Sequence, residues 1–316
     1  MLNYWSYPFE DEILYSVIGR NISYFNIAGP KQQLTNFFGT SNISATLDLP
    51  SGIDYLSKQI KVTGFTSKEI IFKYTLYPYY YHYLSFENRE KIFQSMLFKS
   101  GDIHTRCGIN AGINPSLDTP RYCIQCIQED ILRHKTVYFR RAHQIPSLKI
   151  CVTHNCFLES TIKCPSRINK HSYILADKNL LNEKDSFIRK NHNEQIYSLS
   201  EKLVSLLNIN KTVGFNGTPY YYNEKFKSLG FLKGLDTLKL PEIYEAFNKF
   251  FTIDTLTHFN STVNLENDSC WLKTILRKHR KGFEPVRHIF METFIEQLEK
   301  KYDNSITIKY DPEGHI

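Results

Sequence analysis

"RYCIQCIQED", residues 121–130, and "KICVTHNCFLES", residues 149–160, decide how the middle of this chain folds. Each stretch places two candidate metal ligands two residues apart, and 24 residues separate the pairs, which are Cys123 with Cys126 and Cys151 with His154. Zinc prefers four tetrahedral ligands, and a two-residue gap lets a tight turn direct both members of a pair to one ion. The spacing therefore predicts a Cys3His zinc-binding module of the zinc-ribbon or finger type.

The predicted ion is one structural Zn²⁺, because four protein ligands leave no position for water or substrate. Ordinary buried cysteines, or a thioredoxin-like motif at Cys123 and Cys126, are the alternatives. The redox motif leaves Cys151 and His154 unexplained. Two further cysteines could displace a ligand: Cys156 is expected in a small core beside Phe157 and Leu158, which makes Cys164 the better substitute.

Composition describes a folded chain with more than one core. The 316 residues are 41% hydrophobic and 14% aromatic, with 21 Tyr and 22 Phe. Seven cysteines and the lack of an export signal or long apolar run favour a soluble protein in the reducing cytoplasm, with no membrane partner. The net charge of +7 favours a polyanionic partner, although many cytosolic proteins are as basic.

Apolar residues recurring at three and four positions predict a mainly α fold. In the first region, residues 1–115, helices are expected at 10–25, from Pro30 to just before Gly39, and at 53–62, 67–76 and 86–98, with caps at Thr66 or Ser67 and at Ser85. The zinc module follows at residues 116–165. The third region, residues 166–316, is expected to begin with a surface excursion, 166–194, and to continue with helices at 197–207, 223–229, 241–251, 270–279 and 286–302.

The segment "CWLKTILRKHRKGFEPVRH", residues 270–288, is the most basic short stretch of the chain. A helix here has one apolar stripe, and its other faces carry Lys273, Arg277, Lys278, Arg280 and Lys281. These cations could contact DNA phosphates. A helix end that is simply solvated explains the charge run equally well. Upstream, residues 224–251 permit a helix-turn-helix, but the spacing is loose for that motif and two packed helices explain the pattern as well.

Catalytic patterns are missing from the sequence. A zinc deaminase needs a His-x-Glu upstream of the first cysteine and a Pro directly before that cysteine, and neither is present here. The Walker A loop, the Gly-x-Ser-x-Gly elbow and the His-Glu-x-x-His helix do not occur either. Acidic residues are scattered singly, which does not suit two-metal catalysis. The sequence therefore predicts a protein that is not an enzyme and has no small-molecule substrate, since a zinc nuclease or deaminase needs an open metal position.

Several separated motifs together resemble one family. The stretch of residues 121–160, with its Cys-x2-Cys pair, "FRRAH" and Cys-x2-His pair, resembles the TniQ zinc-binding core, in which many members have Trp at the position of Phe139. The stretches "YPFEDEILYSVIGR", "GPKQQLTNFFG" and "DSCWLKTILRKHRKGFEPVRH" are similar to the TnsD branch of the same family. The resemblance implies that Cys123, Cys126, Cys151 and His154 match the family's zinc ligands.

The resemblance also implies a function, the selection of target sites for a cut-and-paste bacterial transposon. Such a protein binds double-stranded DNA at an attachment site and recruits TnsC, an AAA+ ATPase regulator, which in turn directs the transposase. A cytoplasmic protein associated with the bacterial nucleoid is then expected. The alternative is a TniQ-type adaptor that links a CRISPR surveillance complex to the transposition machinery without reading DNA itself.

Overall fold

The structure, a computed structural model, describes residues 4–25, 29–98, 102–108, 117–161, 169–181, 188–218, 220–268, 270–277 and 282–307. The chain divides into two compact units, Met1–Lys211 and Thr212–Ile316. Helices dominate both units, and the strands within the described ranges form three two-stranded pairs. The mainly α fold is confirmed, whereas the domain boundaries after residues 115 and 165 stay predictions.

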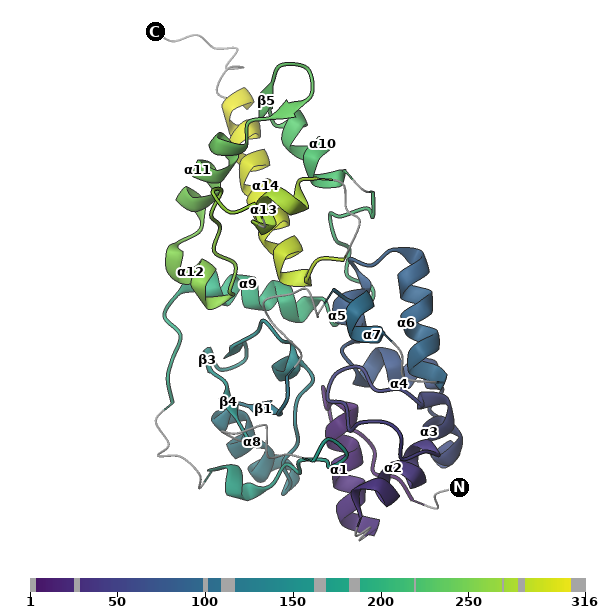
Figure 1. Ribbon diagram of the computed structural model, residues 1–316. Coiled ribbons are helices and arrows are strands. Elements are labelled where there is room, and N and C mark those ends of the chain that lie inside the picture. Colours follow the sequence, from purple (N-terminus) through teal and green to yellow (C-terminus); the bar gives the residue numbers. More distant parts are fainter. Residues whose placement is uncertain are drawn as a thin grey trace. The chain divides into compact units, whose positions relative to one another are not determined.

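The first unit opens with a series of helices, drawn in purple and blue in Figure 1. Their bounds are α1 Leu14–Phe25, α2 Pro30–Phe38, α3 Ile53–Gln59, η1 Lys61–Thr63, α4 Ser67–Tyr74, α5 Tyr77–Tyr81, α6 Phe86–Phe98 and α7 Ile103–Arg106. The predicted helix at 53–62 divides into α3 and the 3-10 turn η1. The predicted helix at 67–76 ends two residues early.

Caps set these helix ends as the sequence predicts. Pro30 lies in the first turn of α2, and Gly39 ends that helix at φ 75°, where an added Cβ would lie 2.8 Å from the ring of Tyr55. Thr66 and Glu69 form a reciprocal capping box on α4. The amide of Asn88 donates to the hydroxyl of Ser85 at 3.3 Å at the start of α6. Local sequence alone therefore specifies these ends.

A buried ion pair organises the motif at residues 7–20. The Glu12 side chain is fully buried, and the Arg20 guanidinium donates to its two oxygens at 2.9 and 2.7 Å. The Ser16 hydroxyl and the amide of Phe9 donate to the same carboxylate at 2.8 and 2.9 Å. Every oxygen of Glu12 is thus paired, as a buried charge requires. The motif is a structural device that fixes the start of α1.

The same turn holds the loop that contains "FRRAH". Asp11 adopts a left-handed backbone at φ 53°, and its carbonyl accepts the amide of Arg141 at 2.6 Å. Its carboxylate accepts the amide of Ala142 at 3.0 Å and pairs with the Arg141 guanidinium at 3.3 Å. The amide of Ile13 donates to the carbonyl of Phe139 at 3.1 Å. Two separated family motifs therefore form one interlocked element.

The central module is built from one helix and short strands, drawn in teal in Figure 1. Its elements are β1 Arg121–Tyr122, α8 Ile124–His134, η3 Ala142–Gln144, β2 Ile150–Cys151, β3 Cys156–Phe157 and β4 Glu159–Ser160. β1 pairs with β4 and β2 pairs with β3, both antiparallel. After it come η5 Lys178–Leu181 and α9 Glu194–Ser205.

In the predicted surface excursion at 166–194, Arg189 and Lys190 are exposed, but backbone bonds that were not predicted join them to the central module. The amide of Phe157 donates to the carbonyl of Arg189 at 2.9 Å, and the amide of Asn191 donates to the carbonyl of Asn155 at 2.9 Å. Lys190 forms an antiparallel bridge with Cys156. These long-range bonds add residues 189–191 to the central module, and hydrophobic periodicity carries no signal for them.

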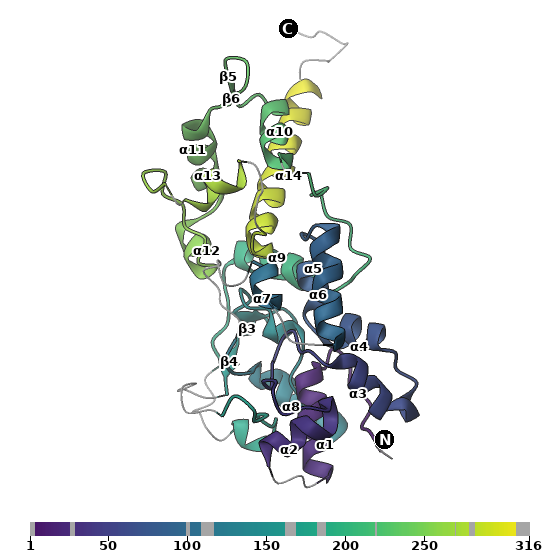
Figure 2. The same ribbon diagram turned by 45° about the vertical axis from the view of Figure 1, so that its right-hand side comes forward.

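The second unit packs its helices around aromatic side chains. Its bounds are α10 Tyr221–Ser228, β5 Leu232–Lys233, β6 Thr237–Leu238, α11 Leu240–Phe250, α12 Ile253–His258, α13 Trp271–Ile275 and α14 Pro285–Thr307. In this unit α14 lies beside α10 and α13 in both views (Figures 1 and 2). Phe294 contacts Phe247 and Phe226, with ring centres 5.4 and 5.8 Å apart, and Phe290 lies 4.8 Å from Phe251. A hairpin, β5–β6, occupies the connection in which a helix-turn-helix needs a short turn.

Candidate functional site

The four predicted ligands come together in the first unit. The ligand atoms of Cys123, Cys126, Cys151 and His154 all lie within 4.8 Å of one another, and this group could hold a metal ion. Cys123 is the N-cap of α8 and Cys126 lies in its first turn. Cys151 ends β2, and His154 lies in the turn between β2 and β3. A helix start and a hairpin therefore each supply one pair.

The spacing of the donor atoms fits a tetrahedral zinc ion. Nδ1 of His154 lies 3.5, 3.3 and 3.7 Å from the sulfurs of Cys123, Cys126 and Cys151. The sulfurs of Cys126 and Cys151 are 3.7 Å apart. Zinc–sulfur bonds of about 2.3 Å and zinc–nitrogen bonds of about 2.0 Å place tetrahedral donors about 3.8 Å (S to S) and about 3.5 Å (S to N) apart. The side chains are already arranged at these distances.

A hydrogen bond to Glu129 fixes the orientation of the imidazole. Nε2 of His154 lies 3.0 Å from Oε1 of Glu129, one turn after Cys126 on α8. With the proton on Nε2, Nδ1 faces the sulfurs with a free lone pair, which is how metal-ligating histidines are commonly held. The sequence analysis did not select Glu129. Its position three residues after Cys126, on the same helix face, is the signal that could have identified it.

The pKa values of the clustered thiols are shifted in opposite directions. Hydrogen bonds from the thiols of Cys126, Cys151 and Cys156 hold the pKa of Cys123 far below its usual range. The contact with Cys123, then the contact with Cys151 and burial, raise the pKa of Cys126. The contact with Cys123, then burial, raises the pKa of Cys156. A cation at the centre can replace these protons, because coordinating thiols are deprotonated.

A second buried ion pair lies behind the cluster. The Arg140 guanidinium donates to both oxygens of Asp130 on α8 at 2.8 and 2.7 Å, and the Asp130 side chain is only 2% exposed. Burial lowers the pKa of nearby His143 to about 3, so that its imidazole is neutral at neutral pH. "FRRAH" therefore braces α8 and packs beside the candidate metal centre without supplying a ligand.

The basic segment is only partly within the described ranges. On α13 the predicted apolar stripe is confirmed, since Trp271, Leu272, Ile275 and Leu276 are all buried. Lys273 is half-buried and pairs with Asp268 at 4.0 Å, and Arg277 is exposed. Lys278, Arg280 and Lys281 lie outside the described residues, as does Cys164. Of the five predicted DNA-contacting cations, the structure thus shows Arg277 exposed and Lys273 with a side chain only 17% exposed.

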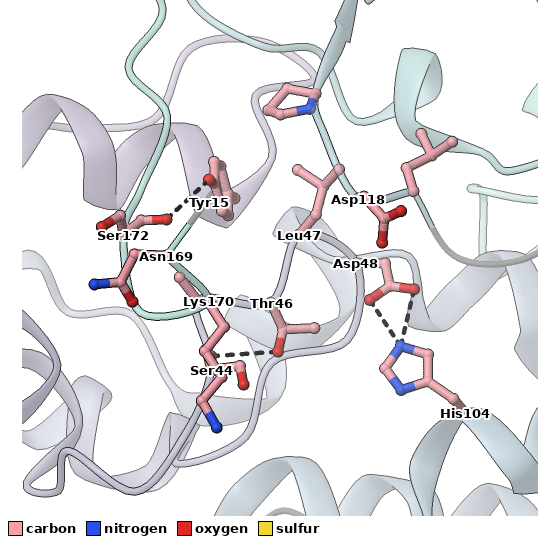
Figure 3. A pocket seen from close by; sticks show the side chains of 13 residues that line it. Tyr15, Ser44, Thr46, Leu47, Asp48, His104, Asp118, Asn169, Lys170 and Ser172 are labelled. Carbon is pink, nitrogen blue, oxygen red and sulfur yellow. Dashed lines mark hydrogen bonds and ion pairs between the residues drawn. The ribbon is translucent and has the colours of Figure 1, made fainter. Parts of the chain in front are cut away.

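A pocket of about 670 Å³ lies in the first unit, among residues 44–48, 117–120 and 169–172. Figure 3 shows Asp48 and His104 facing each other at its wall. Nε2 of His104 lies 3.0 and 3.1 Å from the two Asp48 oxygens, and this bond raises the pKa of His104 above its ordinary 6.5. Protonation of His104 therefore strengthens the attachment of α7 to this loop.

Replacing His104 with Gln is expected to destabilise the protein by roughly 1 kcal/mol at acidic pH. A raised pKa in the folded state contributes stability that is fully present below the unfolded pKa and is lost as pH rises through the folded value. Urea unfolding followed by circular dichroism, at about pH 5.5 and about pH 8.5, should give a smaller difference between variant and parent at the higher pH. An equal difference in unfolding free energy at both pH values would show that the His104–Asp48 ion pair does not contribute to stability.

Comparison with known proteins assigns the chain to a family. The TniQ family model matches residues 4–158, and the TnsD family model, described as Tn7-like transposition protein D, matches residues 199–315. Transposon Tn7 transposition protein TnsD of Escherichia coli is 26% identical over 292 residues. The chain belongs to the TnsD/TniQ family. The aligned region covers 89% of this chain and 55% of that relative, so the chain spans about half the relative's length.

Each of the two family matches contains one of the candidate sites. The TniQ match contains all four candidate metal ligands and both interlocked motifs, and the TnsD match contains the whole basic segment. The resemblance inferred from the sequence is therefore confirmed. Within the described ranges, no helix combines the length and apolar character needed to cross a bilayer.

Proposed function

We propose that this protein selects target sites for transposition: it binds double-stranded DNA at an attachment site and recruits an AAA+ regulator of the TnsC type, which directs the transposase. The observation that carries the proposal is the TnsD match over residues 199–315, joined to the TniQ match over residues 4–158. The relative's name, transposition protein, supports the same role. The role is one of recognition and recruitment in the bacterial cytoplasm, at the nucleoid, and involves no catalysis.

The metal centre in this proposal is one structural Zn²⁺ held by Cys123, Cys126, Cys151 and His154. The donor set and its distances support zinc, and the four protein ligands fill the tetrahedron. When bound, the ion cross-links the start of α8 to the β2–β3 hairpin. The remaining residues orient this link: Glu129 holds the imidazole, and Asp130 with Arg140 braces the helix.

The DNA-contacting surface in this proposal is the basic segment of residues 273–281. The buried stripe of α13 holds the start of this segment against the second unit, while the Arg277 guanidinium is exposed to solvent. Lys273 makes only a long ion pair with the fully exposed Asp268, and such a surface pair contributes little stability. Arg277 can therefore meet phosphate oxygens directly, whereas Lys273, with a side chain only 17% exposed, would have to turn outward to reach them.

Neutralising the basic segment is expected to weaken binding to every DNA sequence and to flatten the salt dependence. Each lost phosphate contact should remove about 0.9 log unit from the slope of affinity against salt concentration. The variants are Arg277→Ala alone and the set of Lys273, Arg277, Lys278, Arg280 and Lys281 changed together to Ala. Fluorescence anisotropy of labelled duplexes over a salt series measures both slopes.

The matched control changes three lysines on helices of the first unit, Lys58→Ala, Lys73→Ala and Lys91→Ala, each half-exposed or more and paired with an acid four residues away. Its slope should equal that of the parent. An unchanged slope in the five-residue variant would take the basic segment out of the DNA interface.

Footprinting on genomic fragments tests the function itself, with and without the AAA+ regulator. Protection of one defined site by the protein alone, extended when the regulator is added, is the expected result. The adaptor alternative predicts no protected site on naked DNA. The TnsD match over the C-terminal half favours direct binding, because this half contains the basic segment.

A further inference from the structure

Cys156 lies beside the candidate metal centre, although it is not among the four clustered donors. It starts β3 and pairs across the hairpin with Cys151, so both side chains project from the same face of the β2–β3 ribbon. Its side chain is only 1% exposed and belongs to the same buried cluster as Cys123, Cys126 and Cys151. The hairpin therefore carries three donors on its metal side: Cys151, His154 and Cys156.

The sulfur of Cys156 is as close to a ligand as the ligands are to each other. It lies 3.4 Å from the sulfur of Cys123, and the closest contacts among the four donors are 3.3 to 3.7 Å. Tetrahedral thiolates on one zinc ion are about 3.8 Å apart, so this separation is compatible with two sulfurs on the same ion. Cys156 therefore lies next to the candidate metal centre, in contact with one of its four donors.

His154 is the ligand that Cys156 can replace. It is the one nitrogen donor of the group, it lies in the turn between the strands, and its side chain is 12% exposed. Its orientation depends on Glu129, whose side chain is 38% exposed. The three cysteine ligands are at most 2% exposed and are held by α8 and β2.

We propose that Cys156 is a reserve ligand of the metal centre, which coordinates the ion when the His154 imidazole is absent. The inference rests on the proposed metal site. In that state Cys156 would supply the fourth donor as a thiolate, and its thiol proton would pass to water. The site becomes more negative by one charge, and Lys190 lies where it can offset this charge, since it bridges to Cys156 and its ammonium donates to the His154 carbonyl at 3.0 Å.

The test compares the metal content and spectra of variants of the whole 316-residue chain. The variants are His154→Ala, Cys156→Ser, the double change His154→Ala with Cys156→Ser, and a matched control, His154→Ala with Cys107→Ser, which alters another buried cysteine of the same unit. Zinc per chain is measured by mass spectrometry. Cobalt-loaded samples report the number of thiolates through the intensity of their sulfur-to-metal charge-transfer band.

The parent and Cys156→Ser should each bind one ion with a three-thiolate spectrum. His154→Ala and its Cys107→Ser control should keep one ion with a four-thiolate spectrum. The double change at His154 and Cys156 should lose at least about tenfold in affinity relative to His154→Ala.

Three results overturn the reserve role. They are loss of the ion or failure to fold in His154→Ala, equal affinity of His154→Ala and the double variant, and loss of the ion in Cys156→Ser alone. Absence of metal from the parent protein overturns the metal site itself. The two failures are therefore distinguishable.

Discussion

Removal of the metal is expected to unfold residues 121–160 within the 316-residue chain. The apparent free energy of structural zinc binding is about 10–16 kcal/mol, and in a small module of this kind most of it is folding free energy. β1 to β4 are each only two residues long and are paired two by two, so the strands cannot hold the module without the cross-link. Hydrogen exchange before and after treatment with a strong chelator should show lost amide protection along α8 and the β2–β3 hairpin.

The same result is expected for Cys126→Ser, which removes one ligand without a chelator. Its matched control is Cys270→Ser, a buried cysteine in the second unit. The control should retain protection throughout the module. Full protection of residues 121–160 in metal-free protein would show that packing alone folds this segment.

Glu12→Gln is expected to destabilise the first unit by about 3–5 kcal/mol. The Arg20 side chain is 11% exposed and would lose the Glu12 carboxylate, which leaves a buried guanidinium charge uncompensated. Urea unfolding, with metal content measured in parallel, should show the loss of stability while the folded protein still binds its ion.

A surface pair provides the control for this prediction. Lys58→Met breaks the pair with Asp54, in which the lysine side chain is 71% exposed, and should cost at most about 1 kcal/mol. Combining Glu12→Gln with Arg20→Met should restore part of the stability, because no unpaired charge remains. Equal costs for Glu12→Gln and Lys58→Met would contradict the structural role assigned to the motif.

Local signals in the sequence were sufficient for much of the helical framework. Pro30, Gly39 and the capping box at Thr66 act within one turn of chain, and the bounds of α6, Phe86–Phe98, agree with the prediction to the residue. The first helix was expected from Glu10 but begins at Leu14, because Glu12 is used to fix the preceding turn.

The missed features depend on contacts between distant segments. Helix α5 contains Pro78 in a run of tyrosines, and buried packing of Tyr79 and Tyr80, not periodicity, holds it. A local sequence pattern likewise predicts neither the β5–β6 hairpin nor the bonds of residues 189–191 to the central module.

The sequence predicted the four candidate ligands but not the residues that contact and orient them. The two-residue gaps identified the four donors that the structure brings together. Glu129 and the contact between Cys123 and Cys156 depend on how α8 meets the hairpin, which the spacing does not determine. DNA contact by the basic segment stays a prediction.

The interlock between the turn at Asp11 and the loop at Arg141 has a consequence for biosynthesis. Ribosomes deliver the amino-terminal turn first, and the loop that docks on it is emitted between the first and second pairs of donors. The nascent loop can therefore settle on a template that is already outside the exit tunnel. Docking of the loop shortens the free chain between the two pairs, and the module becomes stable only when His154 has emerged and the ion joins both pairs.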